Sequence, residues 1–139
     1  MIDPSTDKGR RVDAQLREDL VAWLVTVAPD GTPVPTPVWF WWDGESLLVY
    51  SQPDTLKIRH LTANPRVAIA LRTDEQGDDV AVITGDAAVD ENAPSCAQLP
   101  GYVEKYERSI GRLGADVTGF ALDYAVPNRI RPTKLRATG

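Results

Sequence analysis

A lysine in the first turn of a short predicted helix is the residue best placed to bind a ligand. We expect this helix to begin at Asp54, a suitable N-cap, and to stop at Asn64-Pro65, which puts Lys57 at its third position. A cation there opposes the helix dipole, whereas a phosphate would be favoured by both the lysine and the free backbone N–H groups. The pattern predicts a phosphate site, with a solvated surface helix as the alternative. Further donors nearby in the sequence are Ser51, Gln52 and Arg59.

A proline-rich stretch before this helix predicts an unusual strand. Pro33, Pro35 and Pro37 alternate with other residues, so in an extended chain their missing N–H groups fall on the same edge. Proline is confined to edge strands because it cannot donate to a hydrogen-bond ladder. We therefore expect backbone groups of Thr36 and Val38 to meet the rim of a flat heteroaromatic ring. The alternative is a sheet edge that its prolines protect against aggregation.

The other candidate groups predict neither a metal centre nor a nucleophile. Cys96 is the only cysteine, and one cysteine with one histidine makes no plausible zinc site. His60 could be proposed as an axial haem ligand, but a lone histidine on a short helix more often packs or caps. Tyr102 and Tyr106 have the spacing of a packed helix face. No Ser-His-Asp set, carboxylate pair or metal cluster is visible in the sequence.

The composition favours a small globular protein that binds neither nucleic acid nor membranes. At 139 residues and 42% apolar content, the chain fits one domain, expected over residues 1–139. A net charge of −5 argues against nucleic acid. No apolar run is long enough to span a bilayer, and residues 1–5 lack a signal-peptide pattern, so we expect a cytoplasmic location.

Cations are concentrated at the C-terminal end of this otherwise acidic chain. This asymmetry predicts an anionic ligand or an acidic partner surface, with a solvated terminal strand as the alternative. We expect the basic segment to be tied into a sheet or a partner chain. Its residues are Arg129, Arg131, Lys134 and Arg136.

The predicted elements indicate a mainly antiparallel β fold. Strands are expected over residues 21–27, 33–42, 46–51, 67–72, 80–89, 120–126 and 129–136. The first three form a meander with turns at residues 29–31 and 43–44. Besides the short helix, we expect helices over residues 12–20 and 99–113, the second ending at Gly114. Three tryptophans at positions 39, 41 and 42 cannot all face one small core, so some should line a pocket or an interface.

The sequence resembles a known family in its order of elements and in one central motif. The motif consists of Thr36-Pro37-Val38-Trp39-Phe40, Ser51, Lys57-Ile58-Arg59-His60-Leu61 and Asn64-Pro65-Arg66-Val67. Over nearly the whole chain it is similar to the pyridoxamine-phosphate-oxidase-like split-barrel flavoproteins. More narrowly, it resembles the small actinobacterial branch that uses coenzyme F420, a deazaflavin with a phosphate and an oligoglutamate tail. The resemblance implies a mainly β fold, a six- to seven-stranded antiparallel split barrel with flanking helices.

The resemblance also implies where a cofactor would bind. It implies a homodimer with the ring in a cleft between protomers, against residues 36–39, and with the phosphate on Lys57. Many members have Asn at the position of His60, and many end in a Trp that this chain lacks. The implied cofactor-binding residues are Pro35, Thr36, Pro37, Val38, Trp39, Ser51, Gln52, Lys57, Ile58, Arg59 and His60.

Several functions are compatible with this resemblance. An F420-dependent oxidoreductase would transfer hydride to an electron-poor small molecule such as a quinone, an enone or a tetrapyrrole. An FMN-dependent oxidoreductase with the same site is the alternative, and a non-catalytic flavin or F420 carrier, or a haem-binding relative, is a third. The basic C-terminal segment favours the more anionic F420. Vitamin B6 oxidation is not expected, because authentic pyridoxamine-phosphate oxidases are longer.

Overall fold

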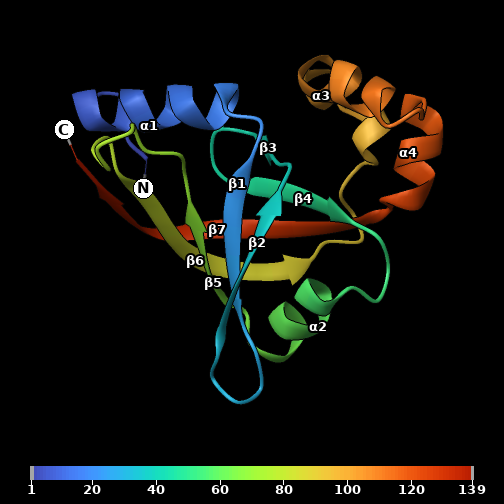
Figure 1. Cartoon of the computed structure of the whole chain (residues 1–139), viewed down its shortest axis with the longest axis horizontal. Coiled ribbons are helices and arrows are strands. Elements are labelled where there is room, and N and C mark those ends of the chain that lie inside the picture. The colour runs from blue at the N-terminus through green and yellow to red at the C-terminus, as the bar shows by residue number, and fades with distance from the viewer. Residues whose placement is uncertain (1, 139) are drawn as a thin grey trace.

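The protein contains one curled, seven-stranded sheet with the strand order β2-β1-β5-β6-β7-β4-β3. A computed structural model describes residues 2–138; residues 1 and 139, the ends of the expected domain, lie outside the described part. All the strand pairs are antiparallel, which confirms the split barrel (Figure 1). The strands are β1 (Ala22–Val27), β2 (Pro33–Val38), β3 (Trp41–Trp42), β4 (Leu47–Ser51), β5 (Arg66–Ala70), β6 (Ala81–Val89) and β7 (Val126–Ala137).

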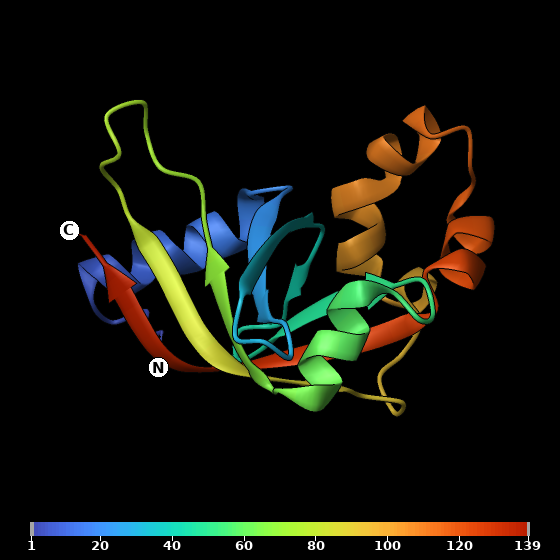
Figure 2. The ribbon, with the colours of Figure 1, turned by 60° about the horizontal axis from the view of Figure 1, so that its bottom comes forward.

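Helices flank the sheet on different sides. Figure 1 shows α1 along the upper rim, α2 at the lower right, and α3 with α4 beyond the end of β4. Figure 2 shows the same pair standing apart from α1 at the other end of the molecule. We call the segment from η1 to α4 the helical arm. The elements are α1 (Asp7–Glu18), α2 (Leu56–Ala63), η1 (Cys96–Gln98), α3 (Pro100–Arg112) and α4 (Val117–Asp123).

Two hydrophobic clusters hold these layers together. The first lies inside the curl, where Val12 and Leu16 of α1 and Leu61 of α2 meet inward residues of the strands. The second joins the helical arm to the outer side of β4 through Leu48 and Tyr50. Because neighbouring residues of β4 point to opposite faces, this strand is buried on both sides. The arm is thereby fixed to the barrel wall.

The barrel closes at a two-residue link. The sequence predicted one strand over residues 33–42 in a three-stranded meander, but the chain leaves the sheet at Trp39 and Phe40. Strands β2 and β3 then lie at opposite ends of the strand order, and β4 pairs with β3 and β7, not with β2. The meander prediction is therefore wrong. We call Trp39 and Phe40 the barrel seam.

The predicted strand over residues 120–126 is also wrong, because most of it is the helix α4. The Asp116 side chain accepts a hydrogen bond from the Gly119 amide at 2.7 Å and caps the helix. Phe120 and Ala121 are buried within the helical arm, and β7 begins only at Val126. Apolar residues at 117, 120 and 121 have helical spacing, which outweighs the strand propensity of the segment.

Smaller differences concern helix ends. Thr55, not Asp54, is the N-cap of α2, since Asp54 has a φ of 60° and α2 begins at Leu56, so Lys57 lies at the second helical position. Helix α1 ends at Glu18, which leaves Leu20 46% exposed instead of on the buried stripe. The predicted end of α2 at Asn64-Pro65 is confirmed. Gly114, with a φ of 76°, follows the C-cap of α3 as predicted.

The clustered tryptophans separate as expected. Trp42 is buried in the barrel core and its indole N–H donates to the Asp13 carboxylate at 2.8 Å. Trp41 packs against the helical arm. Trp39, at the seam, lines a pocket. Each indole therefore faces a different environment.

Candidate functional site

A cavity of about 200 Å³ lies beside the barrel seam. One wall comes from the end of β2 and the seam, and the opposite wall from β4. Helix α2 contributes the one charged side chain, and α4 contributes two aromatic rings. We call this cavity the seam pocket; it is lined by Pro37, Val38, Trp39, Val49, Tyr50, Lys57, Phe120 and Tyr124.

Stacked aromatic rings form one side of the seam pocket. Trp39 and Phe120 stack with their centroids 5.5 Å apart, and Phe120 and Tyr124 stack at 4.3 Å. Behind them, Trp39 stacks on Tyr106 at 4.8 Å. Tyr50 is held by its hydroxyl, which donates to the Pro94 carbonyl at 2.7 Å, and burial raises its pKa. The pocket therefore has an aromatic lining whose rings are held in place by packing within the protein.

Lys57 supplies the charge in this pocket. It is half-buried in the first turn of α2, and burial alone lowers the pKa of its amine. None of the ion pairs found within residues 2–138 includes it. The Thr55 hydroxyl at the N-cap is also buried without a hydrogen-bond partner. An anion at this helix end would meet an unpaired cation, backbone N–H groups and a free hydroxyl.

The other residues predicted to bind the cofactor near Lys57 lie in different places. Ser51 is fully buried inside the barrel, where its hydroxyl accepts a hydrogen bond from the Asn128 side-chain amide at 3.0 Å. Gln52 and Arg59 are exposed at the surface, and Ile58 is partly buried. The Asn128 side-chain oxygen is buried and has no partner. None of the four predicted residues Ser51, Gln52, Ile58 and Arg59 lines the seam pocket.

The proline strand is an edge strand, as predicted. Thr36 pairs with Leu24 and Val38 with Ala22 across the β1–β2 ladder. Because prolines cannot donate, the N–H groups of this ladder must come from the residues between them. The amides of Thr36 and Val38 are thereby paired with β1, and the outer edge presents the carbonyl groups of Pro33, Pro35 and Pro37. The strand reaches the pocket through Pro37 and the Val38 side chain.

His60 lies away from the pocket lining. It is 6% exposed and its Nδ1 lies 3.1 Å from the Thr26 hydroxyl on β1. The contact joins α2 to the inner face of the sheet. His60 therefore packs and positions α2, as a lone histidine usually does.

The basic C-terminal segment is part of β7, as expected, but its arginines are not equivalent. Arg129 donates to Asp90 at 2.8 Å and to Asp43 at 3.2 Å, so its charge is neutralised within the protein. The Arg129 guanidinium also lowers the pKa of Asp90. The cations of this segment that remain exposed are Arg131, Lys134 and Arg136.

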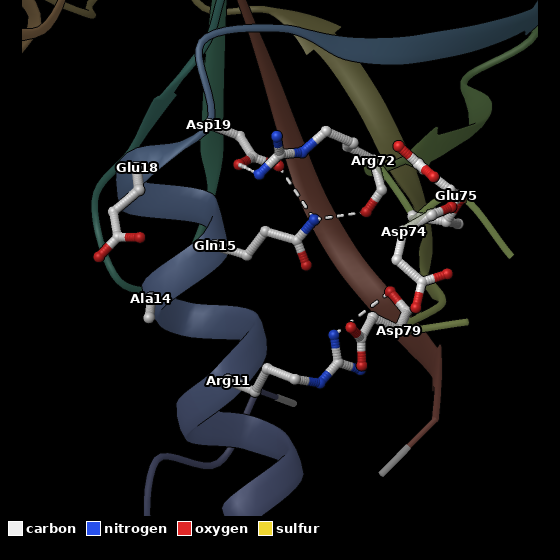
Figure 3. Close-up of a pocket in the computed structure, with 10 residues that line it drawn as sticks. Arg11, Ala14, Gln15, Glu18, Asp19, Arg72, Asp74, Glu75 and Asp79 are labelled. Atoms are coloured by element: carbon white, nitrogen blue, oxygen red, sulfur yellow. Dashed lines mark hydrogen bonds and ion pairs between the residues drawn. The ribbon is translucent and has the colours of Figure 1, made fainter. Parts of the chain in front are cut away.

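A larger groove lies elsewhere and does not suit a phosphate. It encloses about 680 Å³ between α1 and the loop that joins β5 to β6, as Figure 3 shows. Arg11 donates to the carbonyls of Asp79, Val80 and Thr138, and Arg72 lies 3.7 Å from Asp19. The arginines are thus engaged, and the remaining charge is negative: Glu18, Asp74, Glu75 and Asp79.

Two features are absent from residues 2–138, a metal-binding cluster and a membrane-spanning helix. No group of three or more His, Cys, Asp or Glu side chains there could hold a metal ion. No helix of the described part is long and apolar enough to cross a membrane.

Sequence reasoning missed half of the pocket lining. Phe120 and Tyr124 were missed because the sequence predicted a strand where α4 lies. Asp116 as an N-cap, followed by apolar residues at helical spacing, was the signal for the helix. Val49 and Tyr50 lie in a strand that was predicted. They line the pocket because β4 pairs with β7, which could not be read from the sequence. No sequence signal indicates which strands flank a barrel seam.

Comparisons with known proteins agree with this architecture. The family model for pyridoxamine 5'-phosphate oxidase matches residues 9–131. A Listeria innocua protein named for this enzyme superposes with a TM-score of 0.69 at 22% identity, over 92% of this chain and 95% of that one. A structure named F420 reductase gives 0.65 at 28% identity, over 89% and 94%. The heme storage protein HutZ of Vibrio cholerae gives 0.65 at 19% identity, over 94% of both chains.

No curated protein matches the sequence significantly. Among the similar structures are both oxidoreductases and haem proteins by name, so the fold alone does not select an activity. The family model nevertheless spans most of the described chain, and its split barrel is the one observed here. The chain therefore belongs to the pyridoxamine 5'-phosphate oxidase family.

Proposed function

We propose that this protein is an oxidoreductase that binds coenzyme F420 in the seam pocket and transfers hydride to an electron-poor small molecule, such as a quinone, an enone or a tetrapyrrole. Residues 1–139 would form one cofactor-binding domain. FMN is the alternative cofactor at the same site. Both molecules combine a planar tricyclic ring with a phosphate, which are the two features that the pocket suits.

One observation carries this proposal: an unpaired, half-buried lysine opens into a pocket with aromatic walls. A desolvated cation without a partner is unfavourable unless an anion binds beside it. Lys57 and the unpaired Thr55 hydroxyl lie at the amino end of α2, where a helix favours a phosphate. The residues present therefore fit a phosphate-bearing ring.

Each part of the pocket has a distinct task in this proposal. Lys57 holds the phosphate, with the exposed Arg59 and Gln52 close to it in the sequence. Pro37, Val38 and Trp39 support the ring on one side of the seam. The aromatic side chains exclude water from the ring face. When bound, the cofactor supplies the hydride chemistry, so no catalytic side chain is required.

The cations of β7 favour F420 over FMN. Arg131, Lys134 and Arg136 are exposed and would attract an oligoglutamate tail, which FMN lacks. The similarity of 28% to a structure named F420 reductase points the same way. For the haem alternative, the burial of His60 and its contact with Thr26 are unfavourable, because a haem ligand must reach the iron.

We further propose that the active form is a homodimer. The seam pocket of one protomer encloses about 200 Å³, less than the roughly 300–1,000 Å³ usual for small-molecule sites. The outer face of β1, β5 and β6 is largely apolar where solvent would favour polar residues. Cross-strand partners on this face form two rows. One row consists of Trp23, which is 49% exposed, Ala70 and Val82, and the other of Val25, Ala68 and Thr84. A second copy on this face would cover it and could complete the pocket.

Parallel titrations of the purified protein with F420 and FMN test the proposed function. We expect tryptophan fluorescence to change on ligand addition, because Trp39 lines the pocket. Tighter binding of F420 supports the first proposal, and tighter binding of FMN the alternative. No binding of either ligand at about 50 µM would reject both. Reduced cofactor that is never oxidised by a panel of quinones, enones and tetrapyrroles would indicate a carrier.

A further inference from the structure

The barrel seam has backbone groups that no strand satisfies. Phe40 lies between β2 and β3, is fully buried and belongs to neither strand. Buried backbone groups need partners, since leaving one unpaired costs about 1–3 kcal/mol. Both partners of Phe40 come from α3. They are Lys105 and Tyr106, which we call the clasp.

The hydroxyl of Tyr106 joins two links of the chain. It accepts a hydrogen bond from the Phe40 amide at 2.9 Å and donates to the Leu20 carbonyl at 2.7 Å. Leu20 lies between α1 and β1, whereas Phe40 lies between β2 and β3. One buried side chain therefore fixes the start of β1 relative to the end of β2.

Lys105 binds the backbone carbonyl group of Phe40. Its amine donates to the Phe40 carbonyl at 3.1 Å and to the Leu16 carbonyl at 3.4 Å, in the last turn of α1. It also lies 3.8 Å from the centre of the Phe40 ring. A cation at the C-terminal end of a helix is favoured by the helix dipole, and the ring face adds a cation–π contact.

The clasp also supports the pocket wall. The Tyr106 ring stacks on Trp39 with an interplanar angle of 12°, so the same residue holds the backbone of Phe40 and the side chain before it. Trp39 in turn stacks on Phe120 inside the pocket lining. A shift of the clasp would therefore move the wall that faces the ligand.

We propose that Lys105 and Tyr106 are positioning residues that set the width of the seam pocket and hence the affinity for the cofactor ring. This inference rests on the proposed function for its ligand, but the positioning of Trp39 can be measured without one. Neither residue is expected to touch the cofactor, because neither lines the pocket.

The test compares Tyr106→Phe with the control Tyr102→Phe. Tyr102 is also a buried tyrosine of α3, in the same cluster, but no hydrogen bond of its hydroxyl is found in the described part. Protein labelled with 5-fluorotryptophan gives one fluorine signal for each tryptophan, and Trp39→Phe assigns that of Trp39. We expect Tyr106→Phe to shift or broaden the Trp39 signal of the unliganded protein, while the Trp23 signal and the control stay unchanged.

Binding is measured with the same variants. We expect the Kd for F420 or FMN to rise about threefold to tenfold in Tyr106→Phe, because binding must then restore a wall position that the two lost hydrogen bonds held. In Tyr102→Phe the Kd should stay within about twofold. Denaturant midpoints show whether a merely less stable fold explains the change. If Tyr106→Phe does not fold, Lys105→Met carries the test, since it removes the amine and keeps the stacked ring.

The two proposals fail in different ways. An unchanged Trp39 signal and an unchanged Kd in folded Tyr106→Phe would overturn the positioning role. If wild-type protein binds neither cofactor, the proposed function fails, and the fluorine signal alone decides whether the clasp positions Trp39. An equal change in the Tyr102→Phe control would also overturn the inference, because a general loosening of the arm would then explain it.

Discussion

Replacement of Lys57 by methionine separates a ligand-binding lysine from a structural one. Methionine keeps an unbranched, flexible chain and removes the charge. Burial already lowers the pKa of Lys57, and no ion pair within the described residues offsets that cost. We therefore expect Lys57→Met to leave the unliganded fold as stable as wild type or slightly more stable, and to weaken cofactor binding.

The size of the binding loss follows from the interaction removed. A charge-assisted hydrogen bond to phosphate contributes about 1.5–3 kcal/mol. The Kd should therefore rise about tenfold to one-hundredfold. Riboflavin, which has the ring of FMN without its phosphate, should bind wild type and Lys57→Met with nearly equal affinity.

Calorimetric titration of both variants with FMN, F420 and riboflavin provides the assay. Lys8→Met is the matched control, since Lys8 is an exposed lysine of α1. The reasoning would be refuted if Lys57→Met bound FMN as tightly as wild type, or if it lost riboflavin and FMN affinity equally. The second result would place Lys57 beside the ring instead of the phosphate.

Further predictions concern the partner, the packing of α2 and the pH dependence. Trp23→Glu should convert a dimer to a monomer in analytical ultracentrifugation, whereas Leu113→Glu, at a residue that is 63% exposed, should not. Thr26→Val should lower the free energy of unfolding by about 1–3 kcal/mol in urea titrations, because buried His60 loses its partner, with Thr84→Val as the milder control. Burial lowers the pKa of Lys105 to about 8 from 10.5, so the unfolded chain binds more protons between these values. The stability of wild type relative to Lys105→Met should therefore rise from about pH 8 to 10.5, and a flat difference would contradict the assignment.

The sequence contained the local features of this fold but not its closure. The alternating prolines identified an edge strand correctly, because residues without an N–H cannot donate to a second strand on their outer edge. The end of α2 at Asn64 and the left-handed Gly114 also follow from backbone chemistry that acts over a few residues. The break of the proline strand at Trp39 and Phe40 does not, since it depends on Lys105 and Tyr106 far along the chain.

The same distinction applies to the candidate site. Lys57 could be singled out because its charge conflicts with its place in a helix, which is a local argument. Ser51 was expected at the ligand, yet its inward position is set by pairing with β7 and by the Asn128 side chain. The aromatic wall depends on α4, where a seven-residue segment with both helical spacing and β-favouring residues was assigned to the wrong class.

A crystal structure of the protein with bound F420, or with FMN if that binds more tightly, would test the central claim most directly. We predict that the phosphate lies within hydrogen-bond distance of the Lys57 amine at the amino end of α2. The tricyclic ring should lie in the seam pocket against Val38 and Trp39. A cofactor bound in the groove beside α1, or a Lys57 side chain that faces solvent in the complex, would contradict the account.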